Sequence, residues 1–383
     1  MVDKGFRRGQ IISISFAHLL HDIYSSFLAP ILPLLIDKLS LSYSLAGSLS
    51  IYQRIPALFN PIIGILAEKV KSHYFVIVAP AVTSVAMSLL GIAPGYIFLA
   101  VLLLVAGASS TFFHIPAPVM IRGFSGDRVG KGMSWFMFGG ELARTLGPLM
   151  IVGAVNLMGL NGTYKLIPFG LLASIVLYVK LKDIPVEKKY ERRKGETPYG
   201  KVLKQHAGMF INLAGIAFFR GAMKASLTLY LPVYLTHHGE SLWMAGISLS
   251  VLQLSGALGT YYSGTVSDKI GRRNMLLFIT FIAPLLMLVF LQTSGILALV
   301  MLGLIGFFLI SSTSVMLAVV QELDSENLLF LNSIYMTISF VVGSLMVLVV
   351  GFMADKAGLD STYVFSAVFA LPAIWFAWRI PEK

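Results

Sequence analysis

The stretch from Lys180 to Lys204, KLKDIPVEKKYERRKGETPYGKVLK, divides this chain of 383 residues into two apolar parts of similar length. It contains nine Lys and Arg residues against four Asp and Glu residues. Charged blocks of this kind are normally solvated linkers, and the two prolines and two glycines within it prevent one continuous helix. We therefore interpret residues 182–205 as a cytoplasmic basic linker between two membrane-embedded halves, 1–181 and 206–383.

The composition on either side of this linker is that of a membrane protein. Hydrophobic residues make up 57% of the chain and charged residues 12%, whereas about 25% of residues are charged in a soluble protein. The apolar runs are continuous and about 20 residues long, which is typical of spanning helices, and a transmembrane β-barrel would instead alternate apolar and polar residues. We predict an all-α integral membrane protein with twelve transmembrane helices, arranged as two pseudo-symmetric six-helix bundles. The predicted spans are 10–36, 44–67, 74–93, 95–121, 132–157, 162–181, 207–236, 241–266, 274–293, 295–321, 328–354 and 361–380.

The net charge of +11 follows membrane topology rather than nucleic-acid binding. With a cytoplasmic N-terminus, 22 Lys and Arg residues lie on the cytoplasmic side and three (Lys38, Lys165 and Lys356) on the other side, as the positive-inside rule requires. Both termini are therefore predicted to be cytoplasmic. We expect no nucleic-acid partner.

The chain shows no pattern of an enzyme. It has no cysteine, which excludes disulfides, thiolate metal sites and a cysteine nucleophile. It also lacks a Walker loop, a dinucleotide fingerprint and a catalytic triad. We predict no cofactor, no metal and no catalytic residue.

Several ionisable residues fall inside predicted spans, among them Asp22, Arg54, Arg144, Arg220 and Lys224. A central Arg, Lys or Asp costs about 2.5–3.5 kcal/mol when it faces lipid. These side chains must therefore face water or one another. We expect a polar cavity between the two halves.

Two pairs in the first half are candidates for proton coupling. His18 and Asp22 are four residues apart and share a helical face, so Asp22 could exchange a proton as the cavity opens to either side, with His18 as its modulator. The alternative is a structural hydrogen bond. Glu141 and Arg144, three residues apart, either form a static pair or form one that a substrate anion opens by displacing Glu141.

Arg220 and Lys224 are candidates for substrate binding. They are four residues apart on one helix, and two like charges on one face repel each other. They need either an external anion or a carboxylate from another helix, for which Asp22 and Glu141 are candidates.

Other polar residues in the spans allow more than one interpretation. Arg54 could contact substrate or pair with Asp22. Its neighbour Gln53 is a candidate for substrate binding, and so is Gln253, which repeats Gln53 at an offset of 200 residues. His114 could relay protons, bind substrate or make a helix contact.

The loop Gly264-x-x-x-Asp268-x-x-Gly271-Arg272-Arg273 resembles the signature loop of the major facilitator superfamily. Its carboxylate is expected to cap a neighbouring helix N-terminus, and its arginines to close the cytoplasmic face by charge pairing. A degenerate copy with Glu68 lies 200 residues earlier, and a third copy, Gly351-x-x-x-Asp355, lies on the outer side. Recurrence of this kind is typical of nested inverted repeats.

A narrower resemblance is to the fosmidomycin-resistance-like drug exporters. It is carried by four stretches: Ser15-Phe-Ala-His18-Leu-Leu-His21-Asp22, Phe113-His114-Ile-Pro116, Gly139-Gly140…Leu146-Gly147-Pro148-Leu149, and Gln321-Glu322-Leu323.

The resemblance implies a monomeric, multi-pass transporter in the inner (plasma) membrane of a prokaryote, surrounded by membrane lipids. It would exchange protons for a small organic anion or an amphiphilic drug by alternating access, as an efflux antiporter. The alternatives are symport of an organic anion, flipping of an anionic lipid or lysolipid, a non-transporting receptor, and an intramembrane enzyme.

Overall fold

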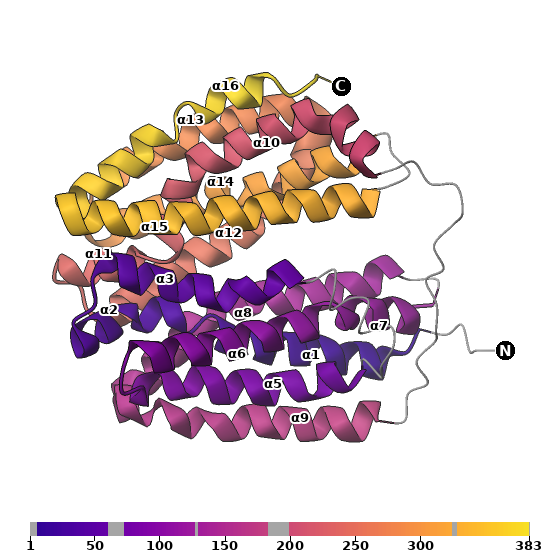
Figure 1. Ribbon diagram of the computed structural model, residues 1–383, viewed down its shortest axis with the longest axis vertical. Helices are drawn as coiled ribbons and strands as arrows, with labels where there is room; N and C mark the ends of the chain where they lie inside the picture. Colours follow the sequence, from indigo (N-terminus) through magenta and orange to yellow (C-terminus); the bar gives the residue numbers. More distant parts are fainter. Residues whose placement is uncertain (1–5, 60–72, 127–128, 183–198, 324–327, 383) are drawn as a thin grey trace. The chain divides into compact units, whose positions relative to one another are not determined.

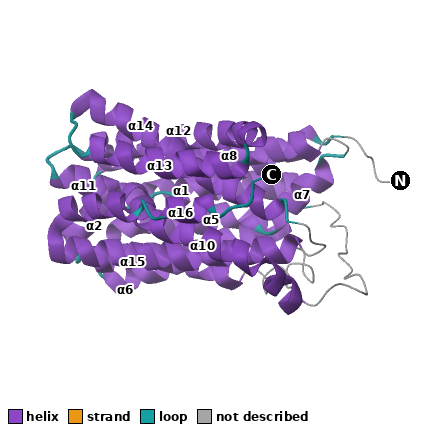
Figure 2. Cartoon of the chain, turned by 90° about the horizontal axis from the view of Figure 1, so that it is seen from above, coloured by secondary structure: helices purple, strands orange, loops and turns teal. Residues whose placement is uncertain are grey.

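A computed structural model of the chain describes residues 6–59, 73–126, 129–182, 199–323 and 328–382. Figure 2 shows that these residues are helical with short connections, and they contain no strand. The predicted all-α class is thus confirmed.

The first half of the chain forms helices that follow the predicted spans closely. Prolines and glycines set several of the breaks, since α7 begins at Pro116 directly after α6 ends at His114. The elements are α1 (Arg8–Ser25), α2 (Leu28–Leu39), α3 (Tyr43–Arg54), η1 (Ile55–Phe59), α5 (His73–Ser88), η2 (Leu89–Ile92), α6 (Tyr96–His114), α7 (Pro116–Phe124), α8 (Val129–Met158), η3 (Leu160–Leu166) and α9 (Ile167–Leu181) (Figure 1).

The second half repeats this pattern. The elements are α10 (Tyr199–Thr228), α11 (Leu231–His237), α12 (Leu242–Ile270), α13 (Arg272–Phe290), α14 (Gly295–Gln321), α15 (Leu328–Phe369) and α16 (Ala373–Trp378). Within α15 the backbone leaves the helical region at Gly358, where φ is +78°, a value that glycine adopts at little cost. The break lies in the connection predicted between spans 328–354 and 361–380.

The predicted linker differs from the structure at its C-terminal end. α10 begins at Tyr199, so the last seven residues of the predicted linker 182–205 are helical. Val202 is only 2% exposed and belongs to the apolar core formed by α10, α13, α14 and α15. This burial stabilises the extra helical turns. Residues 183–198 of the predicted linker lie outside the described ranges.

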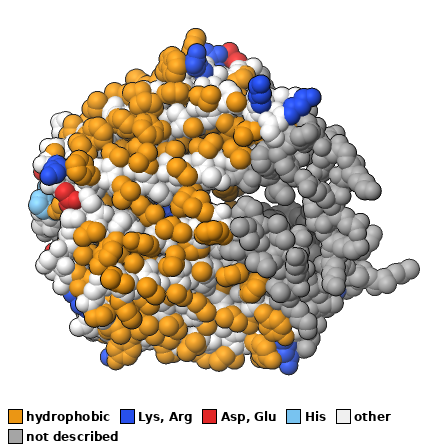
Figure 3. Space-filling view, viewed as in Figure 1, with side chains coloured by type: hydrophobic (Ala, Val, Ile, Leu, Met, Phe, Trp, Pro, Cys, Tyr) orange, Lys and Arg blue, Asp and Glu red, His pale blue; other side chains and the backbone are white. Residues whose placement is uncertain are grey.

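Within the described residues, nine helices are long and apolar enough to cross a membrane. One of these candidates, Ile334–Trp378, includes most of two predicted spans, and predicted span 44–67 ends outside the described residues. The number twelve therefore stays a prediction. On the face shown in Figure 3, hydrophobic side chains predominate, as expected for helices in contact with lipid.

The chain forms two compact units that follow the two halves of the sequence except for two short segments. Unit 1 consists of residues 1–40, 49–190 and 241–250, and unit 2 of residues 41–48, 191–240 and 251–383. Segment 41–48 belongs to unit 2 because Asp355 of α15 accepts hydrogen bonds from the backbone N–H groups of Tyr43 (2.6 Å) and Ser44 (3.0 Å). The carboxylate thereby satisfies the free donors at the start of α3.

Small residues allow close helix packing at the spacings Gly256…Gly259 and Gly303…Gly306. A methyl group on Gly306 would lie 2.2 Å from the carbonyl oxygen of Leu252, and one on Gly259 would lie 2.0 Å from that of Phe307. The backbones of α12 and α14 therefore touch directly. This is the packing that small residues permit in membrane helices.

Candidate functional site

A cluster of three imidazole groups surrounds the carboxylate of Asp22 in unit 1. Nε2 of His18 lies 3.3 Å from Oδ2, Nδ1 of His21 lies 3.1 Å from Oδ1, and Nε2 of His114 lies 3.4 Å from Oδ1. The Nε2 atoms of His18 and His114 are themselves 3.1 Å apart. The predicted pairing of His18 with Asp22 is confirmed, and His21 and His114 complete the group. We call these four residues the His–Asp cluster.

The cluster is held in place by the close approach of α1, α6 and α8. Nδ1 of His18 donates a hydrogen bond to the carbonyl oxygen of Phe136 in α8 (2.8 Å), and the two rings stack with centroids 4.0 Å apart. Gly140 of α8 lies against the same imidazole, since a methyl group there would come within 2.6 Å of Cε1. Nδ1 of His114 donates to the carbonyl oxygen of Ser110, one turn earlier in α6 (2.8 Å).

The third imidazole, that of His21, is completely buried. Its Nε2 lies 3.0 Å from the hydroxyl of Thr83 on α5. Thr83 donates in turn to the hydroxyl of Ser109 on α6 (2.8 Å), and Ser109 donates to the carbonyl oxygen of Ala79 (3.0 Å). Three helices are therefore joined by one chain of hydrogen bonds that starts at the cluster.

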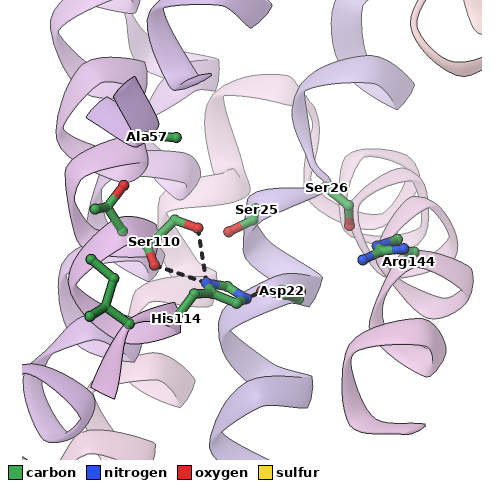
Figure 4. Close-up of a pocket in the computed structure, with 9 residues that line it drawn as sticks. Asp22, Ser25, Ser26, Ala57, Ser110, His114 and Arg144 are labelled. Atoms are coloured by element: carbon green, nitrogen blue, oxygen red, sulfur yellow. Dashed lines mark hydrogen bonds and ion pairs between the residues drawn. The ribbon is translucent and has the colours of Figure 1, made fainter. Parts of the chain in front are cut away.

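The cluster borders a pocket of about 440 Å³ in unit 1. Figure 4 shows Asp22 and His114 together on one side of this pocket and Arg144 of α8 on the other. The pocket is lined by Asp22, Ser25, Ser26, Ala57, Ser110, Thr111, His114, Ile115 and Arg144. It combines a carboxylate, an imidazole, a guanidinium group and several hydroxyl groups, so it can bind a polar molecule.

Arg144 forms the predicted pair with Glu141, with Nη1 and Oε1 2.9 Å apart. The Arg144 side chain is 48% exposed and that of Glu141 is 29% exposed. Because a pair at this exposure is only weakly stabilising, an anion in the pocket can compete with Glu141 for the guanidinium group.

The His–Asp cluster has the chemistry of a cation site. Donor atoms of His18, Asp22 and His114 lie within 4.8 Å of one another, a separation that one metal ion could also bridge. Protons shared between these nitrogen and oxygen atoms are also compatible with the same distances.

The other predicted substrate residues lie in different surroundings. Gln53 donates its amide hydrogen to the carbonyl oxygen of Ser25 (2.8 Å), while Arg54 is exposed at the end of α3. In the part of the chain that the structure describes, the ion pairs of Asp22 are with histidines and not with Arg54. Gln253 is partly exposed on α12.

Arg220 and Lys224 differ although they are one turn apart on α10. Arg220 is 4% exposed and donates to the carbonyl oxygen of Leu309 on α14 (3.0 Å). Its Nε has no hydrogen-bond partner among the described residues. Lys224 is exposed.

The predicted charge pairing at the Gly264–Arg273 loop is observed. Nη2 of Arg272 lies 2.7 Å from Glu322 and also contacts Asp268, and Nη1 of Arg273 lies 3.2 Å from Glu382. Gly271 adopts φ = +89° between α12 and α13, which favours glycine. Glu68 lies outside the described residues.

The helix cap expected at this loop is found at another copy of the pattern. The described contact of the Asp268 carboxylate is Arg272 at the start of α13, whereas Asp355 in the outer copy caps the N-terminus of α3. The reason is proximity, because Arg272 follows Asp268 by four residues, just past Gly271, and supplies a full charge instead of a partial one.

Sequence reasoning did not include His21, Thr83 or Ser109 in the site. His21 stands in the quoted stretch that ends at Asp22, so its position next to the carboxylate was a usable signal. No signal in the sequence pointed to Thr83 and Ser109, since hydroxyl residues are common in these spans. Only the packing of α5 and α6 on α1 brings them to His21.

Residues 14–344 match the family description "Major Facilitator Superfamily". The chain is 27% identical over 376 residues to the fosmidomycin resistance protein of Escherichia coli (strain K12), which covers 95% of this chain and 90% of that protein. It is 24% identical over 369 residues to the multidrug resistance protein MdtG of Serratia proteamaculans (strain 568), covering 91% and 86%.

Among solved structures, a bacterial homologue of the human lysosomal transporter Spinster superposes with a TM-score of 0.82 at 16% identity, covering 98% of this chain and 97% of that one. A D-xylose–proton symporter gives a TM-score of 0.76 at 14% identity and covers 99% of both chains. At these identities the structural likeness shows the fold.

Proposed function

This chain belongs to the Major Facilitator Superfamily and is a multi-pass membrane transporter rather than an enzyme, and from that premise we propose that it couples proton movement to export of a small organic anion or an amphiphilic drug. Both units would rock about a central site to give alternating access. The termini would be cytoplasmic and the protein a monomer in the inner membrane.

The observation that carries this proposal is the position of the His–Asp cluster at the edge of a polar pocket. Asp22 and His18 are the proton-coupling residues that we propose, with His114 as a further member because its Nε2 contacts both. An ionisable group inside a membrane span is costly unless it has a function or a partner. Here the partners are groups that themselves exchange protons.

Arg144 supplies the link between proton and substrate in this proposal. An anionic substrate in the pocket pairs with the guanidinium group and displaces Glu141, which then has to take up a proton or meet water. The exposure of both side chains supports such an exchange. Glu141 is thus a further proton-coupling residue, and Arg144 the central substrate-binding residue.

The remaining cationic and amide residues contribute to substrate binding in the same proposal. Arg220 offers a buried guanidinium group whose Nε hydrogen is unused among the described residues. Arg54 and Lys224 are exposed cations that attract anions by long-range electrostatics. Gln53 positions the end of α1 through Ser25, and Gln253 is its counterpart in the second half.

The loop from Gly264 to Arg273 acts as the cytoplasmic gate. Its two arginines pair with carboxylates at the ends of other segments, Glu322 and Glu382. All four residues belong to unit 2, so these pairs fix the shape of the loop within that unit. Export as the direction of transport is supported by the names of the curated relatives, which are resistance proteins.

The test is transport in proteoliposomes that contain the purified protein, with a radiolabelled phosphonate, a carboxylate and a cationic drug as probes. We expect an anion to accumulate against its gradient only when a pH difference is imposed, and Arg144→Gln to abolish this while Arg144→Lys retains part of it. Accumulation of substrate inside the vesicles, driven by protons that flow inward together with it, would indicate symport. Movement of a fluorescent lysolipid alone would indicate a flippase. Absence of any pH-driven transport would refute the proposal.

A further inference from the structure

Only one direction of the chain behind His21 turns all three of its contacts into hydrogen bonds. The carbonyl oxygen of Ala79 can only accept, so the hydroxyl of Ser109 must donate to it. Ser109 then accepts from Thr83, and each hydroxyl has a single hydrogen. Thr83 must therefore accept from His21, which places a hydrogen on Nε2 of that imidazole.

The other two imidazole groups are fixed in the opposite tautomer. Nδ1 of His18 lies 2.8 Å from the carbonyl oxygen of Phe136, and Nδ1 of His114 lies 2.8 Å from that of Ser110. A carbonyl group cannot donate, so both Nδ1 atoms carry hydrogen. In all three rings the nitrogen that faces away from the cluster is thus the protonated one.

The nitrogens that face the cluster have no hydrogen when the rings are neutral. Two such lone pairs, on Nε2 of His18 and of His114, would then face each other at 3.1 Å. A third, on Nδ1 of His21, would face an oxygen of ionised Asp22 at 3.1 Å. Lone pairs at this distance repel each other, whereas one hydrogen between each pair turns both contacts into hydrogen bonds.

We propose that the His–Asp cluster holds two shared protons, one between His18 and His114 and one between His21 and Asp22. His21 is then a further proton-binding residue, and Thr83 and Ser109 are positioning residues that fix its tautomer. The proposal rests on the proposed function only for its consequence in transport, because the hydrogen positions themselves can be measured without transport.

The surroundings favour positive charge on the two inner imidazole groups. Phe136 stacks on His18 with centroids 4.0 Å apart, and Phe113 stacks on His21 at 4.8 Å. The negative face of an aromatic ring attracts a cation. His114, with 38% of its side chain exposed, gives protons a path from the pocket to the cluster.

The charged groups that face the cluster come from three helices. α1 supplies Asp22 together with its two histidines, α6 supplies His114, and α8 supplies Arg144 across the pocket. The positive charge of Arg144 opposes protonation of the cluster, and its pairing with Glu141 offsets that charge. α5 contributes the neutral hydroxyl of Thr83.

The test is solid-state nitrogen-15 NMR of the purified transporter with labelled histidine, after treatment with a chelator, with the His21 signals identified from the variant His21→Gln. We expect hydrogen on both nitrogens of His21 in the natural protein and in Thr83→Ser, which keeps the hydroxyl. In Thr83→Val the isosteric side chain cannot accept a hydrogen bond. His21 should then lose hydrogen from Nε2, and the cluster should hold one proton fewer.

The same three proteins are compared in proteoliposomes. Thr83→Val should lower proton-driven transport at least tenfold while exchange of substrate without a pH gradient continues, and Thr83→Ser should restore the rate. A neutral His21 with a bare Nε2 in the natural protein would overturn the proposal, as would one equivalent of tightly bound metal found by elemental analysis. If Thr83→Val does not fold, the spectrum of the natural protein decides alone. If the spectrum is as expected but no pH gradient drives transport, the proposed function fails and the two shared protons remain.

Discussion

Replacement of Gly140 by alanine tests how closely α8 must approach the His–Asp cluster. The added methyl group would lie 2.6 Å from Cε1 and 2.8 Å from Nε2 of His18, whereas ordinary contact begins at 3.4 Å. The ring or the helix must therefore retreat by 3.4 − 2.6 = 0.8 Å. The ring cannot retreat freely, because it is hydrogen-bonded to the carbonyl oxygen of Phe136 and stacked on its ring.

Overpacking of this kind costs about 1–3 kcal/mol. For a compact unit of this size that corresponds to a fall in melting temperature of about 2–12 °C. Nε2 of His18 lies 3.1 Å from Nε2 of His114. A displacement of the His18 ring by this amount also takes these two atoms out of hydrogen-bond range. If the whole cost falls on the active arrangement, proton-driven transport drops about 5- to 150-fold, since 1.4 kcal/mol corresponds to a factor of ten.

The assay combines thermal unfolding in detergent with transport in proteoliposomes. Gly153→Ala is the matched control, because it lies on the same helix and its methyl group would meet nothing closer than Trp243 at 3.8 Å. The control should keep both melting temperature and transport. A Gly140→Ala protein that matches this control in both measurements would refute the packing argument.

Three further predictions concern single contacts. Asp355→Ala removes the acceptor at the start of α3 and should lower the free energy of unfolding by about 0.5–2 kcal/mol. Its melting temperature should therefore be lower than that of the neighbouring variant Lys356→Ala, and equal melting temperatures would contradict the cap. Gly306→Ala forces α12 and α14 apart, since its methyl group would lie 2.2 Å from a backbone oxygen, and we expect a destabilisation of about 1–3 kcal/mol by thermal unfolding, with an unchanged melting temperature as the contrary result. Glu141→Gln frees Arg144 from a partly exposed pair worth about 0.2–1 kcal/mol, so anion binding measured by calorimetry should tighten about 1.4- to 5-fold, and weaker binding would argue against competition between Glu141 and substrate.

The fold was largely predictable from the sequence because the membrane imposes a simple rule on it. Every backbone polar group inside a bilayer needs an internal partner, so each long apolar run has to be helical, and the helix 295–321 coincides with its predicted span. The start of α10 was missed, since burial of Val202 in a tertiary core outweighs the polar composition of the linker.

The site was predictable only where its residues share a helix. The spacings of His18 with Asp22 and of Glu141 with Arg144 predict contacts that the structure confirms. Contacts between helices, such as that of His114 with Asp22, depend on packing at Gly140 and on helix rotation, which spacing alone does not fix. The cap by Asp355 joins residues more than 300 positions apart for the same reason.

The central claim is that Asp22 and its histidines couple protons to substrate, and the variant Asp22→Asn tests it most directly. In proteoliposomes loaded with unlabelled substrate, the variant should still exchange labelled for unlabelled substrate without a pH gradient. It should fail to accumulate substrate when a pH gradient is imposed, because an amide cannot take up or release the proton. Full proton-driven accumulation by Asp22→Asn would contradict the account.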